Sequence, residues 1–374
     1  MLTSDYIVVG SGITGATFAR LLSDAGREVV VVERRPVVGG NVHDELHESG
    51  ISIHTYGPHY FRTSSTRIWN FVTRFDRFRK YEAEVLSEID GTYERWPVTR
   101  ECVNRLAGVE WHPAFTGHPE NFEQACLSFL PTPVYLKFVK GYTEKQWGVA
   151  AALLSANLAK RVPLRDDGDF RLSHHKHQGL PIHGYTAWMK EFLSGIPIVL
   201  NTDYLQSRDS FRHRKLLIFT GPIDEFFRYR IGRLRYRGQR REHRYFPERD
   251  YVLPGVQVNN PSVSAGAHVR KIEWKYLMPT SIRQAIQGTV VTTEIPYAPT
   301  NSDCYEYPFP DEVNRELYGE YRSGANELSR TLICGRLGEY RYYDMDQAIG
   351  RAMSLASGIL GKEKVTALAG YAKL

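Results

Sequence analysis

Hydrophobic residues near the start of the chain follow a pattern that predicts a strand, a turn, a helix and a second strand. Residues 6–9 form a short apolar run that leads into the glycine-rich segment GSGITG. The next segment, ATFARLLSDAG, has apolar residues at helical spacing and ends at Gly26, and the run REVVVVE then ends at Glu33. This order of elements predicts a Rossmann-type α/β unit.

The glycine-rich segment has the spacing of a phosphate-binding turn, GxGxxG, formed by Gly10, Gly12 and Gly15. The first glycine permits the tight turn, the second lets the backbone approach a pyrophosphate, and the third lets the helix pack on the strand. Unpaired N–H groups at the start of the helix attract the anion, and Glu33 stands where a carboxylate accepts hydrogen bonds from a ribose. We therefore expect a dinucleotide site, with a purely structural turn as the alternative.

A second glycine pair indicates which dinucleotide is bound. Gly39 and Gly40 follow the second strand in the segment ERRPVVGGNV. NAD enzymes seldom have a glycine pair there, whereas the segment resembles FAD enzymes of the glutathione-reductase superfamily, in which the pair bends the chain along the cofactor. We therefore expect FAD, with an ordinary turn as the alternative for this pair.

Length, composition and charge limit the architecture and the partners. The 374 residues exceed the roughly 250–300 at which one hydrophobic core stops growing, so several structural units are expected. With 42% hydrophobic and 24% charged residues, the composition excludes the disordered, collagen and coiled-coil classes. The formal net charge of +6 fits acidic small ligands as easily as polyanions, so it selects no partner.

The cysteines and the N-terminus bear on the compartment. Cys102, Cys126, Cys304 and Cys334 lie far apart without paired spacing, which predicts neither a disulfide framework nor a zinc site and favours the reducing cytoplasm. The N-terminal apolar run is too short for a signal peptide or for a membrane span of roughly 20 residues. We expect no association with a membrane.

Nine blocks, in the same order, resemble the bacterial UDP-galactopyranose mutase family over nearly the whole chain. They are GSGITGA, ERRPVVGGNV, IHTYGPHYF, KGYTEKQWG, AKRVP, QGLPIHGYT, TGPIDEFFRYR, LRYR and GRLGEYRYYDM. The resemblance implies a redox-neutral conversion of a nucleotide-linked galactopyranose to galactofuranose. It implies that N5 of reduced FAD attacks the anomeric carbon while the nucleoside diphosphate leaves, and that the protein orients the reactants. It also implies a homodimer.

The resemblance implies residues for each part of a sugar nucleotide. Arg161 and Arg270 match the family's two diphosphate arginines, whose planar charged forks suit phosphate oxygens. His59 is implied beside flavin and sugar, and Arg62, where the family usually has histidine, adds a cation there. The residues implied for substrate binding are Phe138 and Tyr142, on one helical face, with Gln146, Trp147, Arg237, Tyr307 and Tyr342. A surface charge or core packing is the alternative for any one of them.

The residues that the resemblance implies for FAD lie in separate parts of the chain. They are Gly10, Gly12, Ile13, Thr14 and Gly15, then Glu33, Arg34, Gly39, Gly40 and Asn41, and finally His59, Arg336, Tyr343, Asp344 and Met345. Asp344 is also expected to cap the C-terminal helix, whose N-terminus would then face the isoalloxazine ring or the pyrophosphate.

We expect three interleaved units. The FAD-binding unit is predicted from residues 1–65, 181–227 and 309–374, and an inserted helical bundle from residues 96–160. Residues 66–95 and 228–308 are predicted to supply the strands of an antiparallel sheet over the substrate, and residues 161–180 a mobile loop.

Departures from the family pattern leave the substrate open. Arg62 replaces a histidine, and residues 164–179 differ from the family loop, which commonly carries aromatic residues that close over the nucleotide. A mutase that acts on a GDP-hexose, such as GDP-galactose or GDP-fucose, is therefore an alternative to one that acts on UDP-galactose. A flavin oxidoreductase such as an amine oxidase shares the first block, but it needs no paired diphosphate arginines.

Two further patterns suggest functions that we do not favour. His174, His175 and His177 point in divergent directions and lack a carboxylate partner at ligand spacing, so we expect no metal site. Residues 228–244 mix arginine and tyrosine as nucleic-acid-binding surfaces do. Their alternation of charged and apolar positions instead predicts strands with one solvated face, so we expect no nucleic-acid partner.

Overall fold

The computed structural model describes residues 1–165 and 167–371, and its first unit is built on a five-stranded parallel sheet. The strand order is β12-β2-β1-β13-β19, all pairs parallel. The bounds are β1 (Leu2–Val9), β2 (Val29–Val32), β12 (Ile198–Val199), β13 (Phe211–Phe219) and β19 (Thr331–Ile333). The α/β fold expected from the N-terminal pattern is confirmed.

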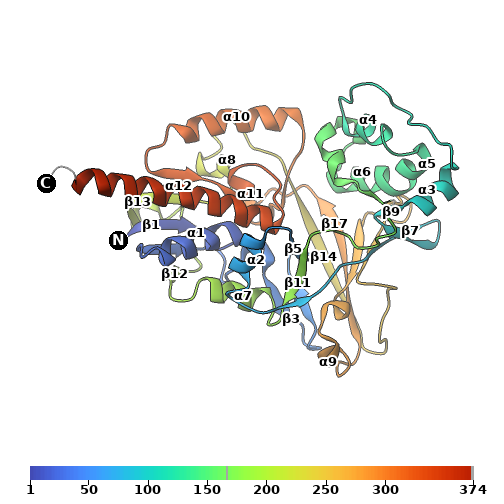
Figure 1. Ribbon diagram of the computed structural model, residues 1–374, viewed down its shortest axis with the longest axis horizontal. Helices are drawn as coiled ribbons and strands as arrows, with labels where there is room; N and C mark the ends of the chain where they lie inside the picture. Colours follow the sequence, from blue (N-terminus) through green and yellow to red (C-terminus); the bar gives the residue numbers. More distant parts are fainter. Residues whose placement is uncertain (166, 372–374) are drawn as a thin grey trace.

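Helices cover both faces of this sheet, because successive strand residues point to opposite sides. Tyr6 and Val8 belong to a core that includes α1 (Ile13–Asp24), α7 (Tyr185–Phe192) and α12 (Met345–Tyr371). Ile7 packs on the other face with residues of α8 (Ile223–Phe226). Figure 1 shows α12, in red, running alongside α1, with α10 (Glu312–Asn326) above it.

A seven-stranded sheet forms the second unit and carries three of the residues expected at the substrate, Arg237, Arg270 and Tyr307. Its order is β18-β14-β17-β16-β15-β7-β8, and every pair is antiparallel except β15 with β7. The bounds are β7 (Val85–Ile89), β8 (Thr92–Trp96), β14 (Tyr236–Phe246), β15 (Gln257–Asn259), β16 (Arg270–Glu273), β17 (Thr289–Tyr297) and β18 (Tyr307–Pro308).

A helical unit lies at one end of the seven-stranded sheet, away from the parallel sheet (Figure 1). It contains α3 (Arg100–Ala107), α4 (Phe122–Leu127), α5 (Thr132–Val134), the π-helical segment η2 (Tyr135–Lys140) and α6 (Gly141–Trp147). Its own core includes Cys126, Tyr135 and Phe138, each at most 3% exposed. The chain between Val98 and Arg161 therefore folds around a separate hydrophobic centre.

Short elements connect these units. The strands are β3 (Asp44–Leu46), β4 (Ser52–His54), β5 (Phe61–Thr63), β6 (Phe78–Lys80), β9 (Val98–Thr99), β10 (Leu164–Arg165) and β11 (His177–Pro181). The helical segments are α2 (Thr66–Val72), α9 (Thr280–Arg283), α11 (Gly335–Gly338), η1 (Gly40–Val42), η3 (Ala151–Leu153), η4 (Ala156–Arg161), η5 (Arg208–Ser210), η6 (Trp274–Leu277) and η7 (Ser302–Cys304). Within the described residues, no helix combines the length and the apolar character needed to cross a membrane.

Part of residues 66–95 differs from its predicted place in the substrate sheet. Ile68, Phe71 and Val72 of α2 instead pack in the core of the parallel-sheet unit, because they form the apolar side of a short helix. β6 pairs with β11 in a three-stranded sheet. Residues 161–180, predicted as a loop, include β10 and the start of β11, and Asp166 lies outside the described residues.

Candidate active site

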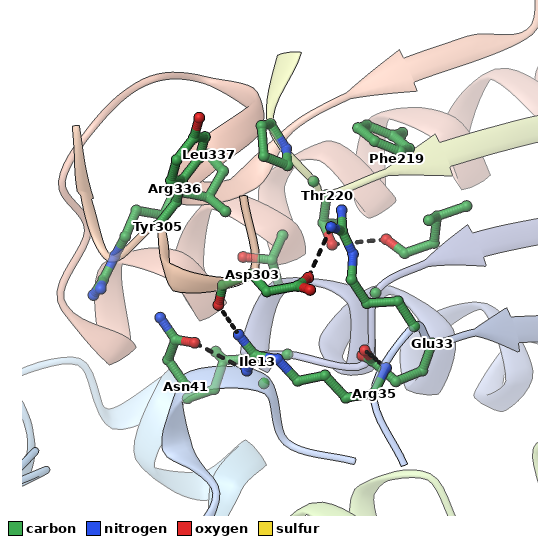
Figure 2. Close-up of a pocket in the computed structure, with 18 of the residues that line it drawn as sticks. Ile13, Glu33, Arg35, Asn41, Phe219, Thr220, Asp303, Tyr305, Arg336 and Leu337 are labelled. Atoms are coloured by element: carbon green, nitrogen blue, oxygen red, sulfur yellow. Dashed lines mark hydrogen bonds and ion pairs between the residues drawn. The ribbon is translucent and has the colours of Figure 1, made fainter. Parts of the chain in front are cut away.

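An elongated pocket lies where β1, β2 and β13 end, and Figure 2 shows its lining. Every residue that was predicted for FAD lines this pocket except Gly15 and Asp344. Thr202, Asp203, Tyr204 and Leu205 also line it and have no sequence signal of the kind that marks the glycine turn. Ligands in open α/β sheets bind at the carboxyl ends of the strands, so the pocket is in the expected position.

The glycines of the turn are required by close contacts. A Cβ on Gly15 would lie 1.9 Å from the carbonyl oxygen of Gly10, and a Cβ on Gly40 would lie 2.8 Å from the Cα of Gly12. Gly10 has a φ of +97°, which favours glycine. α1 begins at Ile13 without a side-chain cap, so the N–H groups of its first turn are free for an anion. The cradle fits the pyrophosphate of FAD.

Glu33 is held by the turn that it follows. This carboxylate is 5% exposed, and its Oε2 accepts hydrogen bonds from the Ser11 N–H at 2.8 Å and the Ser11 hydroxyl at 2.6 Å. Its Oε1 accepts a bond from the N–H of Arg35 at 2.9 Å. Glu33 therefore fixes the glycine turn and presents its remaining lone pairs beside the pocket. Ser11 was missed in the sequence, although a hydroxyl residue between two motif glycines was a usable signal.

Two arginines after Glu33 tie a distant segment to the pocket. Arg34 donates to Glu225 at 2.8 Å and to Asp303 at 3.0 Å, and Arg35 donates to the side chain of Asn41 at 3.1 Å and the carbonyl of Asp303 at 3.1 Å. Figure 2 shows the bonds of Arg35 to Asn41 and to Asp303 along the pocket wall. Arg34 lines the pocket and also holds η7 in place through its bond to Asp303, so its contact with the cofactor stays a prediction.

His59 lies in the same pocket with a defined proton position. Its Nδ1 is 2.7 Å from the carbonyl oxygen of Gly57, so Nδ1 carries the proton and donates. Burial, together with His54, Arg336 and Arg241, holds the pKa of His59 well below its usual value. The neutral ring therefore keeps a lone pair on Nε2 as a hydrogen-bond acceptor in the pocket.

A cluster around the Tyr342 ring adjoins the FAD pocket. The guanidinium carbon of Arg161 lies 3.6 Å from the centre of the Tyr342 ring, and that of Arg336 lies 4.8 Å from it. The rings of Tyr307 and Tyr342 stack with centres 5.9 Å apart and planes 8° apart. The structure thus brings together Arg161, Tyr307 and Tyr342, which come from distant parts of the sequence.

Arg270 enters this cluster from β16. Its Nε donates to Glu294 at 2.5 Å, and its two terminal nitrogens have no hydrogen-bond acceptor among the described residues. Burial raises the pKa of the Tyr142 hydroxyl, while the charges of Arg270 and Arg161 oppose that rise. Tyr142 therefore lies within electrostatic range of both arginines.

Other predicted substrate residues have different surroundings. Phe138 is 3% exposed in the core of the helical unit, while Tyr142 is partly exposed near the arginines, so the two do not share an environment as their spacing predicted. The π-helical geometry of η2 changes the spacing on which that prediction depended. Trp147 packs edge to face on Phe309 with centres 5.7 Å apart, and Gln146 accepts a bond from Gln239 at 2.8 Å.

Arg237 binds the C-terminal end of α6. Its Nε donates to the carbonyl of Gln146 at 2.7 Å and its Nη2 to the carbonyl of Lys145 at 3.2 Å. These are among the last carbonyls of α6, which have no partner within the helix. Arg237, which is only 8% exposed, therefore caps the end of α6, and its direct contact with the substrate stays a prediction.

Replacing Arg237 with methionine is expected to lower the free energy of unfolding by about 1–3 kcal/mol, because two buried carbonyls lose their donors. Chemical denaturation of the purified protein measures this change. Arg240→Met is the matched control, because Arg240 lies on the same strand with 65% of its side chain exposed. Equal stability of the two variants would contradict the capping role.

The histidines after β10 do have carboxylate partners, contrary to the prediction. His174 Nε2 lies 2.9 Å from Asp169 and 3.3 Å from Asp167, while Nδ1 lies 3.0 Å from Arg165 Nη1. Arg165 can only donate, so Nδ1 accepts and Nε2 carries the proton that faces the carboxylates. Asp169 also pairs with Arg171 at 2.6 Å. Asp167, Asp169 and His174 thus bring three possible metal-ligand atoms within 4.8 Å of one another, so the absence of a carboxylate partner no longer argues against a metal site.

Arg62 and Asp344 meet at the start of α12. Arg62 Nη2 lies 3.4 Å from Asp344 Oδ2. Asp344 precedes α12, and its carbonyl accepts a bond from the Ala348 N–H at 2.9 Å. Its own N–H donates to the side chain of Gln347 at 3.0 Å. The side chains that bind backbone N–H groups at this helix start are therefore those of Gln347 and Asp346, while the Asp344 carboxylate, predicted to cap the helix, pairs with Arg62.

Comparison with known proteins gives consistent results for sequence and fold. A family model described as UDP-galactopyranose mutase matches residues 137–342, and one described as an NAD(P)-binding Rossmann-like domain matches residues 8–75. A probable UDP-galactopyranose mutase of Klebsiella pneumoniae is 30% identical, with 96% of each chain covered. A dTDP-fucopyranose mutase of Escherichia coli is also 30% identical, with 94% of this chain and 97% of the relative covered.

Solved structures share the fold at lower identity. A crystal structure of reduced UDP-galactopyranose mutase superposes with a TM-score of 0.73 at 16% identity, covering 96% of this chain and 94% of that chain. A putrescine oxidase variant superposes with a TM-score of 0.60 at 13% identity, covering 96% and 99%. The fold is therefore common to sugar-nucleotide mutases and flavin amine oxidases, and it does not distinguish these activities.

Proposed function

Since the chain belongs to the UDP-galactopyranose mutase family, we propose that it is an isomerase that interconverts the pyranose and furanose forms of a nucleotide-linked hexose. Its relatives that are named as mutases act on UDP-galactopyranose or dTDP-fucopyranose, as their names state. The proposal covers the cofactor as well: the pocket at the end of β1 holds FAD, which acts in its reduced form.

One observation carries this proposal: the FAD pocket and the arginine cluster are adjacent, because Arg336 belongs to both. Arg336 lines the pocket, and its guanidinium also lies 4.8 Å from the Tyr342 ring. Arg161 lies on the same tyrosine, and Tyr307 stacks on it. An anionic substrate bound by the arginines would therefore reach the cofactor, as a reaction at the anomeric carbon next to a diphosphate requires.

Some of the side chains bind the leaving group, and others contact the cofactor or the sugar. When bound, reduced FAD supplies the nucleophile for the anomeric carbon. Arg161 and Arg270 bind the diphosphate, whose negative charge increases as it leaves, so these contacts strengthen along the reaction. The hydroxyls of Tyr307 and Tyr342 donate to phosphate oxygens. His59 holds its proton on Nδ1, so it accepts a hydrogen bond at Nε2 from cofactor or sugar.

The base and the sugar are the open parts of the substrate. The two relatives at 30% identity carry different bases and sugars in their names, UDP-galactose and dTDP-fucose. Arg62, which pairs with Asp344, is a cation that can bind the sugar hydroxyls or the phosphates. We propose UDP-galactopyranose as the substrate, with dTDP-fucopyranose and a GDP-hexose as the alternatives. A cytoplasmic homodimer is proposed with it.

The test is a panel of UDP-, dTDP- and GDP-hexopyranoses incubated with dithionite-reduced protein. We expect one of them to give a furanose product, detected by chromatography and NMR, with no net oxidation of the flavin. The oxidised protein should be inactive, because its flavin is not a nucleophile. No furanose from any member of the panel would refute the mutase proposal.

A flavin oxidoreductase is the second candidate, because putrescine oxidase has a related fold. Such an enzyme has no use for Arg270, which is bonded to Glu294 through Nε and whose terminal nitrogens have no acceptor among the described residues. Oxygen uptake during the same incubations would favour this candidate. A purified protein that binds no FAD would exclude both.

A further inference from the structure

A row of charged side chains crosses the seven-stranded sheet behind Arg270. Arg241 on β14 is the register partner of Glu294 on β17, and Arg270 on β16 is the partner of Glu294 on its other side. Residues directly opposite on neighbouring antiparallel strands project from the same face. Glu306, just before Tyr307, extends the row beyond Arg241. Two cations and two anions therefore alternate along the row.

Arg241 binds two carboxylates and, through Nη1, the carbonyl of Gln239 at 3.4 Å. Its Nε donates to Glu294 Oε1 at 2.9 Å, and its Nη1 and Nη2 donate to Glu306 Oε1 and Oε2 at 2.8 and 2.9 Å. Only 8% of its side chain is exposed, and Glu294 is completely buried. Four of the five N–H donors of Arg241 therefore have acceptors in the protein, and its strongest bond toward the other arginine is the one to Glu294.

Each carboxylate oxygen of Glu294 accepts a bond from a different arginine. This arrangement determines which nitrogen of Arg270 binds Glu294. An arginine and a carboxylate by themselves favour a bidentate pair with two parallel bonds. Because Arg241 occupies Oε1, Arg270 binds Glu294 through Nε at Oε2. The terminal nitrogens of Arg270 then remain available to an anion. The two guanidinium groups also outweigh the effect of burial and hold the pKa of Glu294 below its usual value.

We propose that Arg241 and Glu306 are positioning residues, which hold Glu294 so that Arg270 presents its terminal nitrogens to the diphosphate of the substrate. This inference rests on the proposed function and adds to it. Gly57 leaves space that the row occupies: a Cβ there would lie 2.5 Å from Glu294 Oε1 and 3.2 Å from Nη2 of each arginine. Without Arg241, Oε1 is freed, and Arg270 turns toward Glu294 to form the bidentate pair.

The test is a double-mutant cycle on binding of UDP, dTDP or GDP, whichever binds the wild-type flavoprotein, measured by titration calorimetry. Arg241→Met is expected to weaken binding about tenfold or more. In an Arg270→Met background, the same replacement should have no further effect, because Arg241 acts only through Arg270. Unchanged affinity in the single variant, or fully additive losses in the double variant, would overturn the inference.

A second variant tests whether a loss of binding comes from lost positioning of Arg270. The alternatives are an unpaired buried charge and misfolding. Arg241→Met alone leaves Glu306 without its cation, whereas Arg241→Met combined with Glu306→Leu removes the buried pair together and is better tolerated. This paired variant should keep its flavin and still bind the diphosphate about tenfold more weakly, since Oε1 of Glu294 has no arginine. Wild-type affinity in it would overturn the positioning role.

Arg240→Met is the control for the cycle. Arg240 is adjacent to Arg241 in the sequence but is exposed and pairs with Glu242 at 3.1 Å, so its replacement should leave binding unchanged. A loss of affinity equal to that of Arg241→Met would overturn a specific role for the row. Wild-type protein that binds none of the three diphosphates would overturn the proposed function itself, and the inference with it.

Discussion

Replacement of Arg270 by methionine is expected to leave FAD bound and to lower kcat/KM for the mutase reaction by about 10²–10³-fold. Arg270 is held through one bond to Glu294 at 2.5 Å, and its terminal nitrogens have no acceptor in the described part of the chain. They can therefore bind the diphosphate, whose charge rises as the bond to the sugar breaks. Methionine keeps a similar volume but donates nothing.

Steady-state rates with the substrate identified in the hexopyranose panel measure this loss, and the flavin absorbance reports the fold. Lys271→Met is the matched control, because Lys271 follows on the same strand and projects from the opposite face. Arg270→Met also leaves Glu294 with one arginine instead of two. Arg270→Met with Glu294→Gln removes that imbalance, and recovery of wild-type rates in it would contradict a direct role for Arg270.

Local signals in the sequence predicted the cofactor site well. The GxGxxG turn, the second strand and the glycine pair fall within residues 6–40, so each constraint acts on near neighbours. Glycine was required there by backbone contacts such as that between Gly15 and Gly10. Asp203 and Asp303 reach the same pocket from distant segments, and no local pattern marked them.

The charged row could not be predicted in the same way. Arg241 and Glu294 are 53 positions apart and meet only because β14 and β17 pair in one particular register. In the sequence, Arg241 belongs to the arginine- and tyrosine-rich run that we interpreted as strands with one solvated face. That interpretation describes the exposed Arg240, while Arg241 projects to the buried side. Which arginines of the run are buried depends on the register of the strands.

The role of Arg237 shows a further limit. The resemblance places it in the active site, but its acceptors are the backbone carbonyls of Lys145 and Gln146. Every residue except proline carries the same backbone groups, so no side-chain pattern marks such a contact. The same holds for Lys145, which was also missed. It donates to the carbonyls of Ser262 and His268 at 2.8 Å each and thereby fastens α6 to the loop before β16.

The glycine turn on which the FAD prediction rests can be tested by mutation. Gly15→Ala is expected to give protein with little or no bound FAD. The added Cβ would lie 1.9 Å from the Gly10 carbonyl oxygen and 3.3 Å from Val8 Cγ1, both in the packed interface of α1 with β1. Neither neighbour is the end of a flexible side chain, so the helix must move away. Overpacking of this kind costs about 1–3 kcal/mol.

That movement would displace the first-turn N–H groups of α1 and widen the turn at Gly10 and Gly12, which together form the pyrophosphate cradle. Absorbance at the flavin band, relative to protein, measures the bound FAD. Gly319→Ala is the control, because Gly319 lies in α10 with nothing within 4 Å of an added Cβ. Alanine is the better helix former there, so the control should keep its flavin and its stability. Full flavin content in Gly15→Ala would mean that this turn does not hold the cofactor.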